Sequence, residues 1–271
     1  MHWLRMIDNG PKGEFVRTDK ESGETTVLAT AAEGFSDCLV DDAHIYYVES
    51  RSNDVPNNLW RLDRNNPTEP VELASGPISE LTSNDSHLFW RWHLGPAGDE
   101  LRRLAKEGGA PEILVADIEF TMLAADNDNV FWAGGMDGGL TMANTDGTAA
   151  TEISAASRRI FDVTPTGQDV LWAAHSEIWL ASRDSGQGEV VEHAECSVVT
   201  LSIHDRTLAW ADSCHQHPES ASIVTYELEG GEKTTVATDQ DRPSLIAIDG
   251  SGVYWINIVG GSSNQLVHLA L

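Results

Sequence analysis

The stretch "TLAWADSCHQHPES", residues 207–220, places Cys214, His215 and His217 within four positions. Thiolates and imidazoles are the usual ligands of zinc, and they can also act as nucleophile or base. A metal site needs three or four ligands that converge, whereas alternate residues of a strand point to opposite faces. His215 and His217 would then share one side while Cys214 points away. We therefore expect no metal here, and we treat the two histidines as candidate binding residues of a polar loop.

Cys196 precedes the same stretch, and it comes close to Cys214 if the chain forms a hairpin with its turn at Asp205 and Arg206. Antiparallel pairing would then place Cys214 opposite residue 197, within one residue of Cys196. Cross-strand neighbours can meet the Cα separation that a disulfide prefers. We predict a Cys196–Cys214 disulfide if the compartment is oxidising. The third cysteine, Cys38, is expected to be a small buried core residue.

Other loops carry further side chains that could contact a ligand. An aromatic ring beside arginine and histidine, with carboxylates opposite, could bind a sugar, a peptide or a small polar molecule. The candidate binding residues are Glu49, Arg51, Arg91, Trp92, His93, Asp137, His175, His215 and His217. An alternative is an enzyme in which a histidine and a carboxylate of the same loops act as acid and base or hold a metal.

These loops follow a repeated pattern. An aromatic residue closes a short apolar run at Tyr47, Trp90, Trp132, Trp172, Trp210 and Trp255, every 38 to 45 residues. An apolar run and a polar turn precede each aromatic residue, and two more short strands follow the variable loop. Four short strands per repeat indicate a β-propeller blade. Aspartates recur near the turns, where we expect them to cap the backbone; they are Asp41, Asp85, Asp126, Asp205 and Asp249.

The pattern predicts an all-β fold, a single six-bladed β-propeller domain spanning residues 1–271. In a closed ring, N-terminal strands at about 14–30 would join the C-terminal blade at about 244–271 and so cover an exposed strand edge. The alternative is a seven-bladed propeller with an incomplete first blade, because Trp3 lies one repeat before Tyr47. In either case the loops after the second strands would share one face around the channel mouth.

Repeats such as "IAIDGSGVYWIN" at 246–257 resemble those of six-bladed propellers of the YWTD type, and more closely the secreted propeller repeats of myxobacteria. The YWTD tetrapeptide itself is absent, and the nearest forms are "YWIN" at 254–257 and "AWAD" at 209–212. The resemblance implies a fold and carries over no functional residue, because the repeat positions are structural.

The charge balance narrows the choice of partners. The chain has 17 basic and 43 acidic residues, for a net charge of −26. Such a field repels nucleic acid and anionic membranes. No apolar run is long enough for a transmembrane helix. We expect an exported protein, extracellular or periplasmic, with a cytoplasmic location as the alternative. We also expect that it needs no cofactor and recognises a carbohydrate, peptide or protein without catalysis. The sequence leaves the oligomeric state open.

Overall fold

The structure is a computed structural model, and it describes residues 2–6, 13–19, 22–31, 34–50, 56–95, 98–134, 139–154, 159–184, 186, 188–213, 220–259 and 263–271. In these residues 26 strands form seven antiparallel sheets, five with four strands and two with three. The chain has the all-β arrangement of a six-bladed β-propeller, as predicted. It divides into two compact units, which meet in sequence near Glu119.

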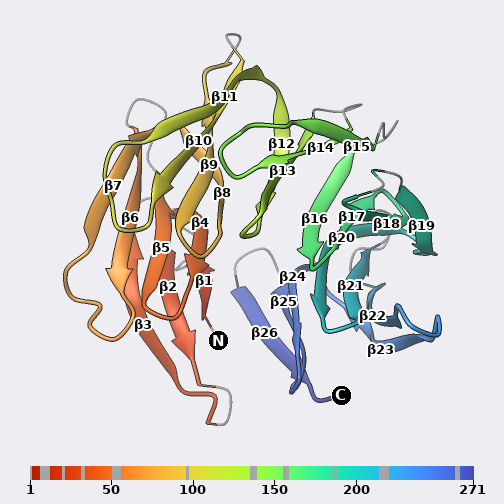
Figure 1. The fold of residues 1–271 in the computed structure, drawn as a ribbon. Helices are drawn as coiled ribbons and strands as arrows, with labels where there is room; N and C mark the ends of the chain where they lie inside the picture. Colours follow the sequence, from red (N-terminus) through yellow and green to blue (C-terminus); the bar gives the residue numbers. More distant parts are fainter. Residues whose placement is uncertain are drawn as a thin grey trace. The chain divides into compact units, whose positions relative to one another are not determined.

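The first unit contains three sheets (Figure 1). The N-terminal sheet consists of β1 (His2–Met6), β2 (Gly13–Thr18) and β3 (Thr25–Ala31). The second consists of β4 (Phe35–Val40), β5 (His44–Glu49), β6 (Asn57–Asp63) and β7 (Val71–Gly76). The third consists of β8 (Ile78–Ser83), β9 (His87–His93), β10 (Asp99–Ala105) and β11 (Glu112–Ile118). Strands β4 and β8, the first of their sheets, are neighbours.

The second unit contains four sheets. Three have four strands: β12 (Phe120–Ala125), β13 (Asn129–Gly134), β14 (Leu140–Asn144) and β15 (Thr151–Ser154); β16 (Ile160–Thr166), β17 (Asp169–Ala174), β18 (Glu177–Ser182) and β19 (Gly188–His193); β20 (Ser197–His204), β21 (Thr207–Ser213), β22 (Ala221–Glu227) and β23 (Lys233–Gln240). The last has three: β24 (Pro243–Asp249), β25 (Gly252–Val259) and β26 (Ser263–Leu269). Strands β16 and β20, and β20 and β24, lie side by side.

Six of the sheets begin with the predicted hairpin, and this hairpin defines the blade. β1 precedes the first of them and pairs with β2, with Trp3 opposite Val16. The N-terminal sheet therefore has the second, third and fourth strands of a repeat but no first strand. The seven-bladed alternative predicted an incomplete first blade of this kind. That the strands at 14–30 complete the C-terminal blade stays a prediction.

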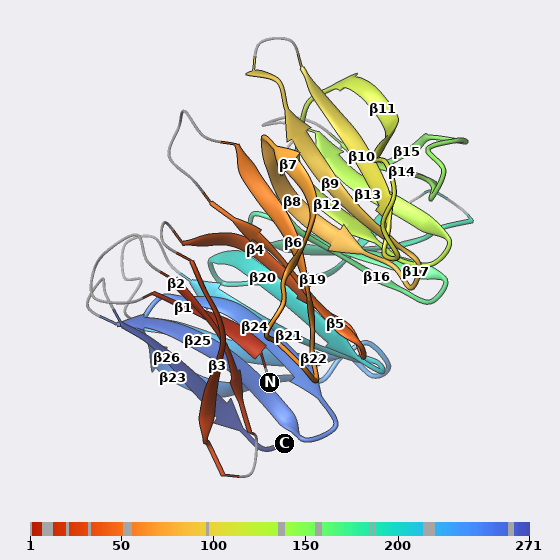
Figure 2. The same cartoon turned by 90° about the vertical axis from the view of Figure 1, so that its left-hand side faces the viewer.

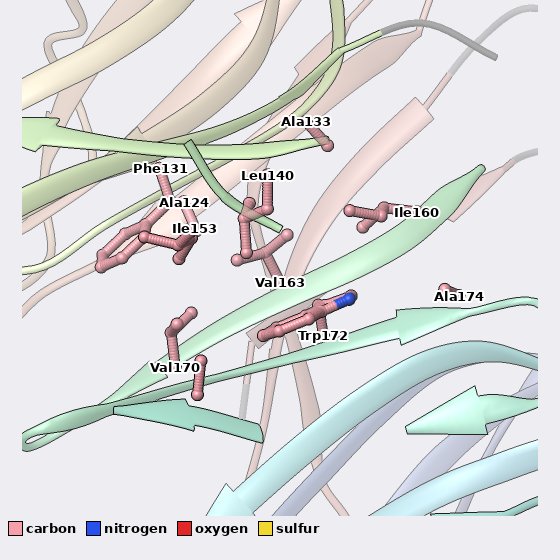
Figure 3. Packing of buried hydrophobic residues seen from close by; sticks show 11 residues of the cluster. Ala124, Phe131, Ala133, Leu140, Ile153, Ile160, Val163, Val170, Trp172 and Ala174 are labelled. Carbon is pink, nitrogen blue, oxygen red and sulfur yellow. The ribbon is translucent and has the colours of Figure 1, made fainter. Parts of the chain in front are cut away.

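The aromatic residues of the repeat form the core, because the second strand of each blade is buried on both faces. Trp90, Trp172 and Trp210 have no exposed surface. Figure 3 shows the cluster around Trp172, where Phe131, Leu140 and Ile153 of the preceding sheet pack above its ring. Residues from consecutive sheets thus share one apolar layer. Each blade buries its apolar faces against its neighbours, because a single repeat cannot bury them alone.

The hairpin turns are capped by side-chain oxygens, as expected for most of them. The carboxylate of Asp41 accepts the N–H groups of Ala43 and His44, and those of Asp126 and Asp249 accept N–H groups two residues further on. In the β8–β9 hairpin the cap is Asn84, so the prediction for Asp85 is wrong. Asp85 instead bonds to the amide of Asn127.

Two aspartates on first strands join neighbouring sheets. Asp37 lies at a β-bulge of β4; one oxygen accepts the N–H of Cys38 at 3.0 Å, and the other accepts the N–H of Leu81 on β8 at 2.7 Å. Asp162 on β16 does the same, with the N–H groups of Val163 at 2.8 Å and of Leu201 on β20 at 2.7 Å. Each carboxylate therefore links the first strands of two adjacent sheets.

Candidate functional site

The triplet "RWH" at 91–93 closes strand β9, and the strand period divides it between two faces. Arg91 and His93 point to one side of the sheet, and Trp92 points to the other. The β9–β10 ladder sets His93 opposite Asp99 (Figure 2 shows the β8–β11 sheet). The backbone beyond β9 is tied down, because the N–H of Leu94 donates to the carbonyl of Gly98 and the N–H of His93 to that of Pro77. The side chains thus stand on a rigid strand end.

Arg91, His93 and Asp99 form one hydrogen-bonded cluster. The Nε of Arg91 lies 2.8 Å from Oδ2 of Asp99, and its Nη2 lies 2.7 Å from the same oxygen. Nδ1 of His93 lies 2.8 Å from Oδ1 of Asp99 and 3.2 Å from Nη2 of Arg91. The side chain of Asp99 is only 3% exposed, whereas that of His93 is 55% exposed. A buried carboxylate therefore holds a half-buried guanidinium and an exposed imidazole in place.

Trp92 does not join this cluster. Its ring packs at the boundary between the β4–β7 and β8–β11 sheets, against the apolar cluster that contains Trp90. The guanidinium carbon of Arg102 lies 3.7 Å from the ring centroid. A Cβ at Gly76 would overlap the ring, so the close approach requires glycine there. The expectation of an aromatic ring beside Arg91 and His93 is therefore wrong, because adjacent residues of a strand face opposite ways.

Two further candidates have local structural roles. Glu49 ends β5 and accepts a hydrogen bond from the indole N–H of Trp60. His175 is exposed in the tight turn between β17 and β18, with a φ of 60°, and its carbonyl accepts the N–H of Val198.

The remaining candidates, Arg51, Asp137, His215 and His217, lie outside the described residues, and so does Cys214. Near the turn the β20–β21 ladder has the predicted register, with Leu201 opposite Trp210. A bulge between Val198 and Leu201 then shifts it by one residue, so that Ser197 faces Ser213. The prediction that residue 197 faces Cys214 is wrong for this reason. The ladder now ends on the two residues that adjoin the cysteines in sequence, and the disulfide stays a prediction.

Cys38 is a free thiol on β4, half-buried as part of a small apolar cluster with Phe15, Ile45 and Tyr47. Burial and the adjacent Asp37 carboxylate raise its pKa to about 12. A thiol that stays protonated at neutral pH is a poor nucleophile. Cys38 thus packs against the apolar cluster as expected, but it is half-buried and not fully buried.

Sequence reasoning missed Asp99, although the signal was available. The glycines of "LGPAGD" at 94–99 indicate a tight hairpin, and a hairpin centred there pairs residue 93 with residue 99. Asp37 and Asp162 were also missed. Burial raises the pKa of Asp37 to about 7, against the lowering effect of the N–H groups that it accepts, and burial raises the pKa of Asp162 as well.

Among the residues that the structure describes, no group of three or more His, Cys, Asp or Glu side chains could hold a metal ion. The described part of the chain also contains no helix with the length and apolar character needed to cross a membrane.

No family model and no curated protein matches the sequence. Solved structures do match. An oligogalacturonate lyase from Vibrio parahaemolyticus is 12% identical, with a TM-score of 0.72 over 94% of this chain and 82% of that one. The structure of a nidogen/laminin complex is 14% identical, with a TM-score of 0.57 over 84% and 89%. TolB from Acinetobacter baumannii is 10% identical, with a TM-score of 0.62 over 99% and 76%.

At these identities the likeness concerns the fold alone. The nidogen/laminin and TolB structures are propeller neighbours, which agrees with the predicted architecture without identifying the YWTD type of repeat in particular. The neighbours include a binding assembly and an enzyme. On the basis of fold, hydrogen-bond pattern and repeat, the chain is a β-propeller protein.

Proposed function

We propose that this protein is a non-catalytic recognition propeller, which binds a carbohydrate, peptide or protein through the loops that follow the second strands. In the described residues the binding surface is the turn end of the β9–β10 hairpin. The single observation that supports it is the cluster of Arg91, His93 and Asp99, in which a buried carboxylate holds two polar side chains at an exposed strand end.

Rigidity is the reason that such a cluster favours binding. A free arginine loses rotamer entropy when a ligand immobilises it, whereas Arg91 has already been fixed by Asp99. The exposed Leu94 follows directly and could contribute apolar contact, since it is 42% exposed. A rigid polar pair beside an exposed apolar side chain resembles the anchor of a small polar ligand site.

A second candidate is an enzyme, and one observation favours it. The bond from His93 to a buried carboxylate is the arrangement that orients a general base. An oligogalacturonate lyase is among the structural neighbours. Recognition remains the preferred proposal, because within the described residues no nucleophile or second acid stands within hydrogen-bond distance of His93.

The test is capture of ligands from printed glycan and peptide arrays by the purified protein. Arg91→Gln combined with His93→Asn should abolish the capture. Arg103→Gln is the matched control. Arg103 is an ion-paired arginine like Arg91, but its partner is Glu112 at the start of β11, and it lies away from Asp99 along β10. Trp92 is unsuitable for this test, since its ring packs in the apolar layer between two sheets. Capture that survives the double substitution would contradict the proposal.

We also propose that the protein is exported and that Cys196 and Cys214 are joined. The support is indirect: the β20–β21 ladder ends at Ser197 and Ser213, which adjoin the two cysteines in sequence. Counting free thiols on the unreduced protein tests this. One free thiol, from Cys38, is expected, and three would contradict the disulfide.

A further inference from the structure

Beside the candidate site, strands β4 and β8 are joined through a carboxylate that has no cationic partner. The two oxygens of Asp37 accept backbone N–H groups, that of Leu81 on β8 at 2.7 Å and that of Cys38 at 3.0 Å. Among the residues that the structure describes, no lysine, arginine or histidine bonds to this half-buried side chain. A charge that is partly removed from water without a cationic partner is costly. The ionised form of Asp37 is therefore disfavoured while the two strands are joined.

The groups around Asp37 act in the same direction. Glu80 on β8 brings a like charge close to it, and among the described side chains the other titratable group beside it is the thiol of Cys38. Val48, the partner of Asp37 on β5, is uncharged. Burial raises the pKa of Asp37 to about 7, and the charge of Glu80 contributes to the rise. Asp37 consequently gains and loses its proton near neutral pH.

A β-bulge lies at each end of the bond between Asp37 and Leu81. On β4 the register with β5 shifts just before Asp37. On β8 the register with β9 shifts at Glu80 and Leu81, which together lie opposite Trp90. The φ of Glu80 is 53°, in a region that residues other than glycine occupy only where their surroundings hold them. The bond to Asp37 supplies part of that hold, because it fixes the N–H that follows Glu80.

The bulge of β8 is continuous with the segment that holds the candidate site. Ser79, next to Glu80, lies opposite Arg91 in the β8–β9 ladder. The carbonyl of Pro77, two residues before Ser79, accepts the N–H of His93 at 3.0 Å. Release of the bulge would therefore loosen the backbone against which the end of β9 is fixed.

From this arrangement we infer that Asp37 is a pH-sensitive contact that controls how firmly the end of β9 is held. With a proton, Asp37 keeps β4 and β8 joined; without it, the carboxylate turns to water and releases the β8 bulge. A protonated Asp37 retains a carbonyl oxygen, which accepts the N–H of Leu81. The inference rests on the proposed function to the extent that the end of β9 is the proposed binding surface, and it makes that surface firmer in acid.

The direction of the pH effect follows from the two states of the carboxyl group. In the joined state the pKa of Asp37 is about 7, and a carboxyl group released into water returns to 3.8. The joined state therefore binds the proton more strongly and prevails at low pH. Its advantage is lost as the pH rises from 3.8 to about 7 and does not change further above that range.

The experiment measures hydrogen exchange of single backbone amides by nuclear magnetic resonance from pH 5 to pH 8, with each rate divided by the intrinsic rate at that pH. The protection of the Leu81 and His93 amides should fall about tenfold or more from pH 5 to pH 7 and then level off. The amide of Lys106 is the control at the other end of the same sheet, where it donates to the carbonyl of Ser86. Its protection should not change.

Three variants separate the carboxylate from its surroundings. Asp37→Asn cannot titrate, so the protection at Leu81 and His93 should be the same at every pH. Glu80→Gln keeps Asp37 but removes the neighbouring like charge, so the loss of protection should occur at a lower pH. This second variant tests the inference even if Asp37→Asn does not fold. Asp117→Asn, at an exposed carboxylate on β11, should behave as the wild type.

The opposing results are distinct. Protection at Leu81 that does not depend on pH would overturn the inference, and so would a fall at Leu81 that leaves His93 unchanged. A parallel fall at Lys106 would overturn it as well, because the whole sheet would then open. These measurements need no ligand, so a protein with the expected exchange but without capture on the arrays would contradict the proposed function and not the pH-sensitive contact.

Discussion

The carboxylate of Asp37 makes the stability of the first unit depend on pH in an unusual direction. Burial raises its pKa from 3.8 to about 7, and the charge of Glu80 acts in the same sense. A proton is therefore held more strongly in the folded state than in the unfolded one. The stabilisation is complete below the unfolded pKa and is lost as the pH rises through about 7. Most paired aspartates behave in the opposite way.

The magnitude follows from the two pKa values. A group that titrates at about 7 when folded and at 3.8 when unfolded contributes about 3 kcal/mol at pH 5 and almost nothing at pH 8. Asp37→Asn removes the titration. It also leaves one of the two N–H groups, from Cys38 or Leu81, facing an amide NH₂, which costs about 1–3 kcal/mol at every pH. The slope with pH, rather than the absolute stability, therefore isolates the carboxylate.

The assay is urea unfolding followed by tryptophan fluorescence at several pH values from 5 to 8. The stability of the wild type relative to Asp37→Asn should fall by about 3 kcal/mol over this range. Contributions from other titrating groups are common to both proteins and cancel in the difference. Asp117→Asn, at an exposed carboxylate with a φ of 57° that asparagine tolerates, is the matched control. A stability difference between wild type and Asp37→Asn that does not change with pH would refute the reasoning.

Three further predictions concern the packing and the covalent structure. Gly76→Ala should lower the free energy of unfolding by about 1–3 kcal/mol, because its Cβ would overlap the Trp92 ring. Gly250→Ala should cost less, because its Cβ would meet only His204 at 3.6 Å; urea unfolding of both variants checks this. Lys106→Met should destabilise the first unit by about 1–3 kcal/mol at pH 7, because buried Lys106 bonds Asp41 at 2.9 Å. That bond contributes to lowering the pKa of Asp41 below 3.8, so the difference between this variant and the wild type should begin to shrink near pH 4 and should be lost as the pH falls through the lowered pKa of the folded state; a difference that does not shrink on acidification would contradict the assignment. Cys196→Ser should lower stability by about 3 kcal/mol in unreduced protein and have no further effect after reduction; equal stability of the two unreduced proteins would contradict the disulfide.

The fold could be predicted because the same pattern of strands and turns occurs six times in the sequence. Each aromatic residue from Tyr47 to Trp255 ends an apolar run after a polar turn, and a period of about 40 residues with four short strands has few other solutions. Most of the side-chain caps of the hairpin turns could also be predicted. The turn caps at Asp41, Asp126 and Asp249 follow from the habit of aspartate to bond its own backbone two residues on.

The site was harder, for reasons that particular residues illustrate. Trp92 appeared to belong with Arg91 and His93 because they are adjacent in sequence, but strand alternation places its ring against Gly76 in the apolar layer. The β20–β21 register shifted at a bulge that no sequence signal marks. Asp37 acquires its role from Leu81 of the next sheet, 44 residues away, so its partner could not be read from the neighbouring sequence.

The central claim is that the cluster of Arg91, His93 and Asp99 belongs to a ligand site, and nuclear magnetic resonance of the imidazole nitrogens tests it most directly. Addition of a ligand captured from the arrays to ¹⁵N-labelled wild-type protein should shift the imidazole resonances of His93 and leave those of His193 unchanged. Unchanged His93 resonances at saturating ligand would contradict the account.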